Sequence, residues 1–400
     1  MHLLLVHNYY QQPGGEDDVF AREQALLEAH GHRTTVYIRR NDEIDQYSLL
    51  DKASLALRTT WAWDSHAEFK RLLGQVKPDL VHVHNTFPLI SPSLYYACSE
   101  ADVPVVQSLH NARLLCAGGN YYRDGRICMD CLGKTVPWPG TVHGCYHNSH
   151  AQTAVVSAML AVHNLRGTFK TLVDSYIVAT EFYRRLFVQA GFPEEKLYVN
   201  PEFVFADPAL DPVPGGYALY TGRLTHEKGV HTLLEAWRQL GDIPLKVRGD
   251  GVLMPELIVA ARQNPAIEVL PRLEKEAYLD LMRGAHFLVW PSVGYYETFG
   301  CVAIEAFAAG VPVITSDIGV NAERVSDGET GVRFKAEDSA DLAAKVRWAW
   351  EHPVELKQMG LRARAEYQRR LTPAAGYAGL MRIYQATLAK RGRAFDSGRV

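Results

Sequence analysis

The sequence lacks several features that would assign the protein to a particular class. It has no apolar run of about 18 residues, the minimum for a membrane-spanning helix. It has no excess of positive charge either, because 42 Lys and Arg residues are set against 45 Asp and Glu residues. A broad nucleic-acid-binding surface is therefore not expected. Residues 1–8 lack the basic start and the small-residue cleavage site of a signal peptide, so they predict a buried strand in a cytoplasmic protein.

Cysteine is also scarce, which makes its distribution informative. The chain has six cysteines, and four of them, Cys116, Cys128, Cys131 and Cys145, lie in residues 112–148, a segment without apolar periodicity. Disulfides are rare in the cytosol. Four thiolates suffice for a tetrahedral structural zinc, which would replace a missing hydrophobic core. Reduced cysteines without a metal are the alternative, because structural zinc sites more often contain two paired motifs.

Length and periodicity predict two domains of the α/β class. A chain of 400 residues exceeds what one hydrophobic core usually holds. Short apolar runs alternate with helical patterns, which is typical of parallel sheets. Strands are expected at residues 2–8, 80–84, 103–109, 176–179, 217–220, 245–248, 267–270, 287–290 and 311–315. Helices are expected at residues 17–30, 65–75, 92–101, 151–165, 229–240, 275–283, 302–309 and 340–350.

The domain boundary is expected at residues 201–216. This stretch contains four prolines and a Gly-Gly pair without periodicity, which indicates a linker. We therefore predict a first domain at residues 1–200 and a second at residues 217–372. A C-terminal helix within residues 373–400 can pack back on either domain, including the N-terminal one.

A first candidate binding motif follows the strand expected at residues 217–220. Residues 221–229 lead through a glycine-containing turn into a helix. Backbone N–H groups and the positive end of a helix dipole favour an anion at such a place. Arg223 and Lys228 add two charges suited to a diphosphate. A surface turn with solvated charges is the alternative interpretation.

A second candidate motif follows the strand expected at residues 287–290. Gly300 allows a tight turn at a helix start, where the amides of Phe299, Gly300 and Cys301 favour an anion or a hydroxyl. Glu297 precedes that helix and Glu305 lies within it among apolar residues, where a charge usually has a reason. Such carboxylates are good acceptors for sugar hydroxyls. One capping and one surface glutamate is the alternative.

Together with residues 249–251 and 327–331, these motifs resemble glycosyltransferase family 4, a retaining family with the GT-B fold. The resemblance covers residues 217–331 and implies two Rossmann-like domains that face each other across a cleft. It implies a UDP- or GDP-sugar donor, with Arg223 and Lys228 on its diphosphate and Gly249 at the donor site. It further implies that Glu305 binds the ribose and that Glu297 binds near the transferred sugar. Gly319-Val320 departs from the Gly-Gly of many members, so the loop there can differ.

The first domain carries weaker signals. Gly14 and Gly15 precede an expected helix and permit close backbone approach, and in the resembling family this loop lies above the donor phosphates. His110 follows a strand at the edge where open α/β sheets bind ligands, and the family resemblance suggests that it contacts the transferred sugar. His84 is expected near this edge, whereas His82 is expected in the core.

An acidic triplet and a pair of tryptophans complete the candidates. Residues 16–18 are acidic and are interpreted as surface that complements the helix dipole, not as a metal site. Trp61 and Trp63, beside Arg58 and Lys70, could touch a membrane surface. Trp61 and Trp63 could equally be core or cleft residues.

No carboxylate of the first domain stands out as a nucleophile, so the resemblance favours a front-face retaining reaction. Arg223, Lys228 and helix N-termini would stabilise the charge on the departing diphosphate without a catalytic metal. The expected acceptor is a glycan or a lipid-linked sugar at the inner face of a membrane, because the family often serves polysaccharide biosynthesis. A nucleotide-sugar epimerase or hydrolase, and a non-catalytic nucleotide-sugar binder, are the alternatives.

Overall fold

The computed structural model describes residues 1–11, 14–205, 216–295 and 297–393. The chain forms two compact units. The first unit contains Met1–Tyr121, Met129–Asn200 and Tyr377–Val400, and the second contains Tyr122–Cys128 and Pro201–Gly376. Most of the expected linker, residues 206–215, lies outside the described residues.

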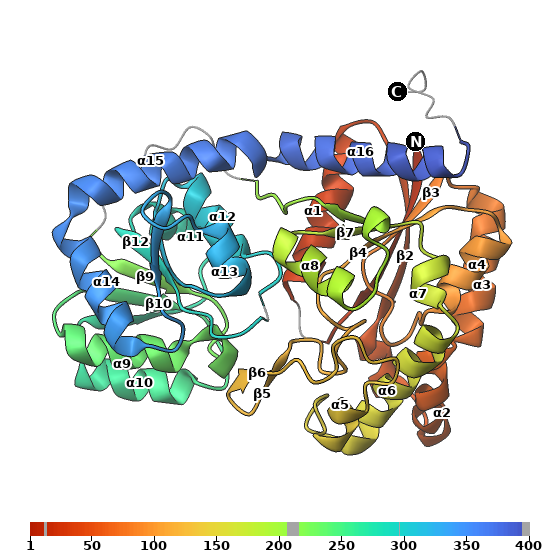
Figure 1. Cartoon of the computed structure of the whole chain (residues 1–400), viewed down its shortest axis with the longest axis horizontal. Helices are drawn as coiled ribbons and strands as arrows, with labels where there is room; N and C mark the ends of the chain where they lie inside the picture. The colour runs from red at the N-terminus through yellow and green to blue at the C-terminus, as the bar shows by residue number, and fades with distance from the viewer. Residues whose placement is uncertain (12–13, 206–215, 296, 394–400) are drawn as a thin grey trace. The chain divides into compact units, whose positions relative to one another are not determined.

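The first unit is built on a six-stranded parallel sheet with the order β2-β1-β3-β4-β7-β8. Figure 1 labels β2, β3, β4 and β7 of this sheet. Its strands are β1 (His2–Tyr9), β2 (Arg33–Arg40), β3 (Leu80–Val83), β4 (Val105–Ser108), β7 (Ser175–Val178) and β8 (Leu197–Val199). The four strands expected in this half are confirmed. The edge strands β2 and β8 were missed because their apolar stretches, at residues 36–38 and 197–199, are only three residues long.

Helices cover this sheet. They are α1 (Gly15–Ala29), α2 (Leu49–Thr60), α3 (Trp63–Val76), α4 (Ser93–Glu100), α5 (Trp138–Val142), α6 (His150–Leu165), α7 (Thr168–Thr171) and α8 (Glu181–Gln189). Helix α16 (Pro373–Lys390) returns from the far end of the chain to the first unit. Its Leu380, Met381 and Tyr384 share a core cluster with Leu3 and Leu5 of β1.

The second unit repeats this architecture, with the parallel order β11-β10-β9-β12-β13-β14. Its strands are β9 (Ala218–Thr221), β10 (Leu245–Arg248), β11 (Ile267–Leu270), β12 (Phe287–Trp290), β13 (Val313–Ser316) and β14 (Gly331–Phe334). The first five were expected. Strand β14 was missed because Gly331 and Arg333 interrupt its apolar residues. Gly331 is required there, since an added Cβ would lie 1.9 Å from the Val313 carbonyl oxygen.

The helices of the second unit pack around one core cluster. They are α9 (Val230–Leu240), α10 (Met254–Gln263), α11 (Lys275–Arg283), α12 (Cys301–Ala308), α13 (Gly319–Arg324), α14 (Ser339–Glu351) and α15 (Pro353–Arg370). Leu233 of α9, Leu257 of α10 and Leu342 of α14 are fully buried against the strands in this cluster. Two doubly wound α/β units are therefore present, which confirms the predicted fold class.

The cysteine-containing segment departs from the α/β pattern, as expected. It contains an antiparallel hairpin of β5 (Tyr122–Arg123) and β6 (Arg126–Ile127). Asp124 and Gly125 join the two strands with φ values of 52° and 77°, which is the conformation of a tight hairpin turn. This hairpin is part of the second unit. None of the helices that the structure describes has both the length and the apolar character to cross a membrane.

Candidate active site

Three loops of the second unit meet where adjacent parallel strands end, the edge at which open α/β sheets bind ligands. Glycines allow their backbones to touch. Gly229 has a φ of 71°, and an added Cβ would lie 1.8 Å from the Pro291 carbonyl oxygen. A Cβ on Gly249 would lie 1.9 Å from the Gly222 carbonyl oxygen. These contacts hold the loops after β9, β10 and β12 together, and they place Lys228 beside the β12 loop.

Lys228 and Glu297 form an ion pair at this junction. Lys228 Nζ lies 2.6 Å from Glu297 Oε1, and the two side chains are 17% and 11% exposed. Ser292 Oγ and Trp290 Nε1 donate to the same oxygen over 2.7 and 3.1 Å. Burial would raise the pKa of Glu297, but Lys228 and these hydrogen bonds outweigh burial and lower it. Glu297 is therefore an oriented carboxylate, and the structure brings two of the predicted site residues into contact.

Glu305 projects from α12 and is held by residues that the sequence did not reveal. Tyr278 of α11 donates from its hydroxyl to Glu305 Oε2 over 2.5 Å. The guanidinium of Arg248 lies 4.4 Å from the centre of the Tyr278 ring, and its Nη1 donates to Thr221 Oγ1 over 3.2 Å. Burial, followed by the charge of Glu305, raises the pKa of Tyr278 well above its usual value. Tyr278 is thus a neutral donor that orients Glu305.

The start of α12 has the features of an anion site. Gly300 has a φ of 68°, and an added Cβ would lie 2.4 Å from Trp290 Cη2, so only glycine fits. The positive end of the helix dipole begins at Cys301. Buried Arg324 donates from Nη2 to the Phe299 carbonyl over 3.2 Å, and burial lowers its pKa to about 10. This cation lies behind the turn and adds positive potential to it.

Arg223 lies at the edge of this group. Its side chain is 55% exposed, and its Nη2 is 3.9 Å from Glu227 Oε1. It is thus less fixed than Lys228, although both were predicted to bind the same diphosphate.

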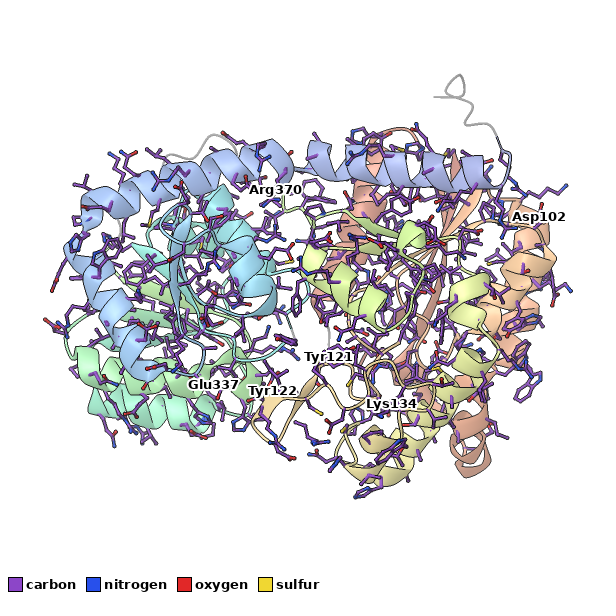
Figure 2. All side chains as sticks on the ribbon, viewed as in Figure 1. Asp102, Tyr121, Tyr122, Lys134, Glu337 and Arg370 are labelled. Carbon is purple, nitrogen blue, oxygen red and sulfur yellow. The ribbon has the colours of Figure 1, made fainter. Side chains whose placement is uncertain are left out.

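The β5–β6 hairpin contributes an aromatic ring to the loop between β12 and α12. An added Cβ on Gly294 would lie 2.9 Å from Tyr122 Cδ2, so the ring covers this glycine. Figure 2 labels Tyr122 and Glu337, which lie in the same unit. Burial, then Glu337 and Glu227, raises the pKa of Tyr122. No local pattern indicates this contact, because the hairpin lies about 170 residues before the loop.

The corresponding edge of the first unit carries a pocket. Its lining includes His84, Asn85, Phe87, His110 and Asn111. His110 is almost fully buried, at 6% exposed, and His84 is 3% exposed. Burial, and then other histidines nearby, lowers the pKa of both rings well below the usual value. Both rings are therefore neutral at pH 7.

The acidic triplet at the start of α1 differs from the prediction of a surface cluster. Asp18 is exposed, but Glu16 and Asp17 are only 8% and 9% exposed. Asp17 Oδ1 lies 2.7 Å from His7 Nε2, and its Oδ2 accepts from the Gly14 N–H over 2.8 Å. Two of the three acids thus lie inside the unit, and not on its surface.

Glu16 accepts a hydrogen bond from Asn111 Nδ2 over 3.1 Å, which links the start of α1 to the residue after His110. Gly14 and Gly15 precede it, and an added Cβ on either would meet no described atom within 4 Å. Burial, followed by the charge of Asp17, raises the pKa of Glu16 to about 7.

The predicted zinc ligands are distributed as follows. Cys116 and Cys131 are buried, and Cys128 and Cys145 are half-buried. Among the side chains that the structure describes, three ligand atoms of His, Cys, Asp or Glu lie within 4.8 Å of one another only at Glu23, His82 and His84. The structural zinc remains a prediction.

Two family models match this sequence. The model described as "Glycosyl transferases group 1" matches residues 211–366. The model described as "Glycosyltransferase Family 4" matches residues 20–127. Between them the two matches include strands of both sheets.

Curated relatives align over part of their length. Glycogen synthase of Mycobacterium tuberculosis (strain CDC 1551 / Oshkosh) is 39% identical over 158 residues, which is 38% of this chain and 37% of that protein. D-rhamnosyltransferase WbpZ of Pseudomonas aeruginosa is 33% identical over 159 residues, which is 39% of this chain and 42% of that protein. The alignments thus span about two fifths of these relatives.

Solved structures align over nearly the whole chain. Anabaena Alr3699/HepE in complex with UDP has a TM-score of 0.67 at 17% identity, covering 96% of this chain and 100% of that chain. Sucrose-phosphate synthase from Thermosynechococcus elongatus has a TM-score of 0.71 at 16% identity, covering 97% of this chain and 99% of that chain. At these identities the likeness establishes the fold alone.

The raised pKa of Glu16 predicts a pH-dependent stability. Its folded-state pKa of about 7 lies above the ordinary value of 4.5, so its contribution to stability is present below pH 4.5 and is lost as the pH rises through 7. Glu16→Gln removes this loss. From pH 5 to pH 8 the variant should gain up to about 3 kcal/mol relative to the natural protein, measured by urea unfolding. Asp18→Asn is the matched exposed control, and a gain that does not change with pH would contradict the assignment.

The zinc prediction is tested by metal analysis of the purified protein. One zinc per chain is expected, and Cys131→Ala should remove it and lower the thermal midpoint, because the segment would lose its substitute for a core. Cys98→Ala, at a buried cysteine of α4, is the control that should retain the metal. Metal-free protein whose midpoint is unchanged by added zinc would exclude the site.

Proposed function

The chain belongs to glycosyltransferase family 4 and has the GT-B fold, and on this premise we propose that it is a retaining sugar transferase. It would move a sugar from a UDP- or GDP-sugar to a glycan or lipid-linked acceptor. The observation that carries the proposal is the junction in the second unit, where Lys228 and Glu297 pair beside the start of α12. The structures of HepE with UDP and with UDP-glucose support a nucleotide-sugar donor.

The junction suits a sugar diphosphate because it offers both kinds of partner. Lys228 and the amides at the start of α12 provide positive charge and N–H donors for phosphate oxygens. Lys228, Trp290 and Ser292 all donate to the same oxygen of Glu297, Oε1. Its other oxygen, Oε2, receives none of these three bonds and would accept from a sugar hydroxyl. Glu305, oriented by Tyr278, would accept from the ribose hydroxyls in the same way.

The proposed reaction replaces the donor phosphate on the same face of the sugar. As the bond to the diphosphate breaks, negative charge grows on the departing phosphate and positive charge on the sugar. Lys228, Arg223 and the α12 dipole would stabilise the phosphate charge as preorganised groups. The acceptor hydroxyl would give its proton to that phosphate. His110 is neutral, so its proposed role is to hydrogen-bond the transferred sugar, not to carry charge.

The function is tested by screening UDP- and GDP-sugars for thermal stabilisation, followed by transfer assays with the donor that binds. Lys228→Ala should lower kcat/KM by roughly 10²- to 10³-fold, because it removes a group that stabilises the leaving phosphate. Glu305→Gln should raise the donor KM by about 10-fold, because a charged hydrogen bond is lost. Glu235→Gln, at an exposed glutamate of α9, is the control and should have no effect.

Product analysis separates this function from its rivals. Cleavage or epimerisation of the donor without any acceptor would indicate a hydrolase or an epimerase instead. Binding of the donor without turnover, unchanged by Lys228→Ala, would indicate a non-catalytic binder.

For the acceptor, we propose a lipid-linked sugar at the inner face of a membrane, approached through an exposed patch of the first unit. Trp63 and Leu57 are 59% and 67% exposed. Trp61 does not belong to this patch, because its ring packs 5.0 Å from that of Tyr96. Lys70 forms an ion pair with Glu100, since its Nζ lies 2.6 Å from Glu100 Oε2, so its charge is partly neutralised. The expected membrane contact is therefore aromatic and apolar more than electrostatic.

Sedimentation with phospholipid vesicles tests this patch. Trp63→Ala should reduce the bound fraction several-fold, while Trp138→Ala, at a similarly exposed tryptophan of α5, should not. Equal sedimentation of both variants and the natural protein, or no sedimentation at all, would remove the membrane from the proposal.

A further inference from the structure

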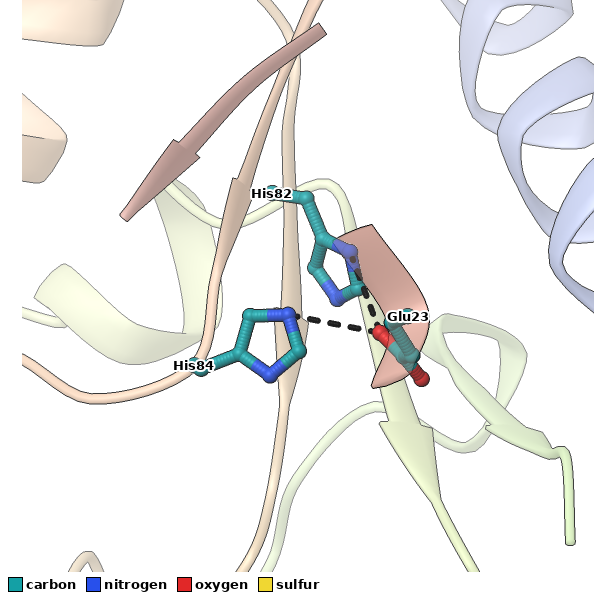
Figure 3. A group of neighbouring side chains, drawn as sticks. All are labelled: Glu23, His82 and His84. Atoms are coloured by element: carbon teal, nitrogen blue, oxygen red, sulfur yellow. Dashed lines mark ion pairs between the residues drawn. The ribbon is translucent and has the colours of Figure 1, made fainter. Parts of the chain in front are cut away.

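A buried carboxylate lies behind the histidines of the first unit. Glu23 of α1 is 3% exposed and faces His82 and His84 (Figure 3). His82 lies on β3, and His84 is the residue directly after that strand. Burying a carboxylate among strands is unfavourable unless it has polar partners. No role in the proposed reaction has so far used Glu23 or His84, although His84 lines the same pocket as His110.

Glu23 connects to His110 through His84. Glu23 Oε2 lies 3.3 Å from His84 Nε2. On the other side of the ring, His84 Nδ1 lies 2.9 Å from His110 Nε2. The two rings are nearly parallel, with an interplanar angle of 16°. These three side chains form what we call the carboxylate–histidine chain, which runs from inside the unit to the pocket.

His82 is not part of that chain. Its Nδ1 lies 2.7 Å from the Tyr384 hydroxyl and its Nε2 lies 2.9 Å from Ser108 Oγ, whereas Glu23 Oε2 is 3.7 Å away. Both ring nitrogens are thus engaged by hydroxyl groups. Burial lowers the pKa of His82 to about 3, so the ring is neutral. The spacing of Glu23, His82 and His84 would also suit a metal, but these hydrogen bonds account for His82 without one.

The protons in the chain follow from elementary rules. A neutral imidazole has one N–H donor and one acceptor nitrogen, and a carboxylate only accepts. The Glu23–His84 contact has the geometry of an ion pair and not of a hydrogen bond, and the charge of a Glu23 carboxylate 3.3 Å from Nε2 favours the His84 proton on that nitrogen. This leaves Nδ1 as an acceptor. His110 then donates from Nε2 to His84. The proton of His110 is thus on Nε2, and its Nδ1 is the acceptor atom.

We propose that Glu23 is a positioning residue which, through His84, fixes the orientation and tautomer of His110 so that its Nδ1 accepts a hydrogen bond from a hydroxyl of the transferred sugar. This inference rests on the proposed function for the identity of the hydroxyl. It does not rest on it for the tautomer, which is a property of the protein alone. Other groups near the two histidines are His7, whose ring centre is 6.2 Å from that of His84, and His82 at 4.4 Å.

In this proposal Glu23 acts on His110 through His84 and does not itself contact the sugar. A histidine whose second nitrogen is held by a fixed partner keeps one tautomer and one ring angle, as in triads where a carboxylate orients a catalytic histidine. Loss of that partner leaves His110 in the pocket but allows the ring to donate where it should accept. A loosened group in an active site costs about 10- to 100-fold in rate.

The tautomers can be read directly from ring-15N-labelled histidine by long-range 15N–1H correlation spectra. His84→Gln and His110→Gln variants assign the signals. In the natural protein both His84 and His110 should be protonated on Nε2. In Glu23→Gln, whose amide can donate as well as accept, both rings should show mixed tautomers. His110 protonated on Nδ1 in the natural protein, or unchanged tautomers in the variant, would overturn the proposal.

Kinetics of the same variants provide the second readout. Glu23→Gln should lower kcat about 10- to 100-fold with little change in the donor KM, because the site remains but one group is misoriented. Tyr384→Phe is the matched control, since it removes a hydrogen bond of His82 beside the same carboxylate. It should lower the thermal midpoint and leave the tautomers and kcat unchanged. An equal loss of kcat in both variants would show that Glu23 only stabilises the fold.

The two proposals fail separately. The spectra need no substrate, so they remain decisive if no nucleotide sugar is turned over. Conversely, active transfer by Glu23→Gln at the natural rate would refute the positioning role and leave the proposed function intact.

Discussion

The backbone contact between Gly229 and Pro291 is the constraint on which the second half of the candidate site depends. An added Cβ on Gly229 would lie 1.8 Å from the Pro291 carbonyl oxygen, so the loops after β9 and β12 approach as closely as two backbones can. The residue before Gly229 is Lys228, and the β12 loop carries Glu297. Their ion pair follows from this approach. A local rule about glycine thus determines a long-range pairing of charges.

In the first unit, the burial of histidine side chains is the constraint on the polar contacts around the pocket. His7, His82 and His84 are at most 3% exposed, and burying a polar ring is unfavourable unless polar groups contact it. Each partner is itself polar and buried, so the requirement extends from ring to ring until it reaches Glu23, Asp17 or the pocket. This is why a core that is otherwise apolar contains a connected polar network.

The sequence predicts what depends on local pattern and misses what depends on tertiary contact. Nine strands were predicted from apolar runs, and the three missed strands of the two large sheets are edge strands or contain Gly331 and Arg333. Lys228, Glu297 and Glu305 could be found because they belong to motifs at strand ends. Tyr278 could not, because nothing in α11 indicates that its hydroxyl meets Glu305.

Glu23 and Glu16 are further residues whose surroundings depend on tertiary contacts and could not be predicted from the sequence. A glutamate in a helix is usually a surface residue, and no periodicity distinguishes the few that face inward. What makes Glu23 different is the pair of histidines on β3, about 60 residues later in the sequence. Glu16 was interpreted as surface because it stands at a helix start, where acids are common for electrostatic reasons. Its neighbour Asn111 becomes visible only in the fold.

The two units differ in the charge of the groups near their strand ends, and this difference suits them to different parts of a ligand. The second unit keeps ionised groups near its strand ends, with Lys228 against Glu297 and Arg324 behind α12. Such groups match a ligand that carries charge, as a diphosphate does. The pocket of the first unit is lined mainly by uncharged groups, with Arg113 as a cation among them, and the carboxyl bonded to Asn111 is close to half-protonated at pH 7. Neutral donors and acceptors match hydroxyl groups, which carry no charge to stabilise. By its chemistry alone, the second unit suits the ionic diphosphate of a nucleotide sugar, and the pocket of the first unit suits neutral hydroxyl groups.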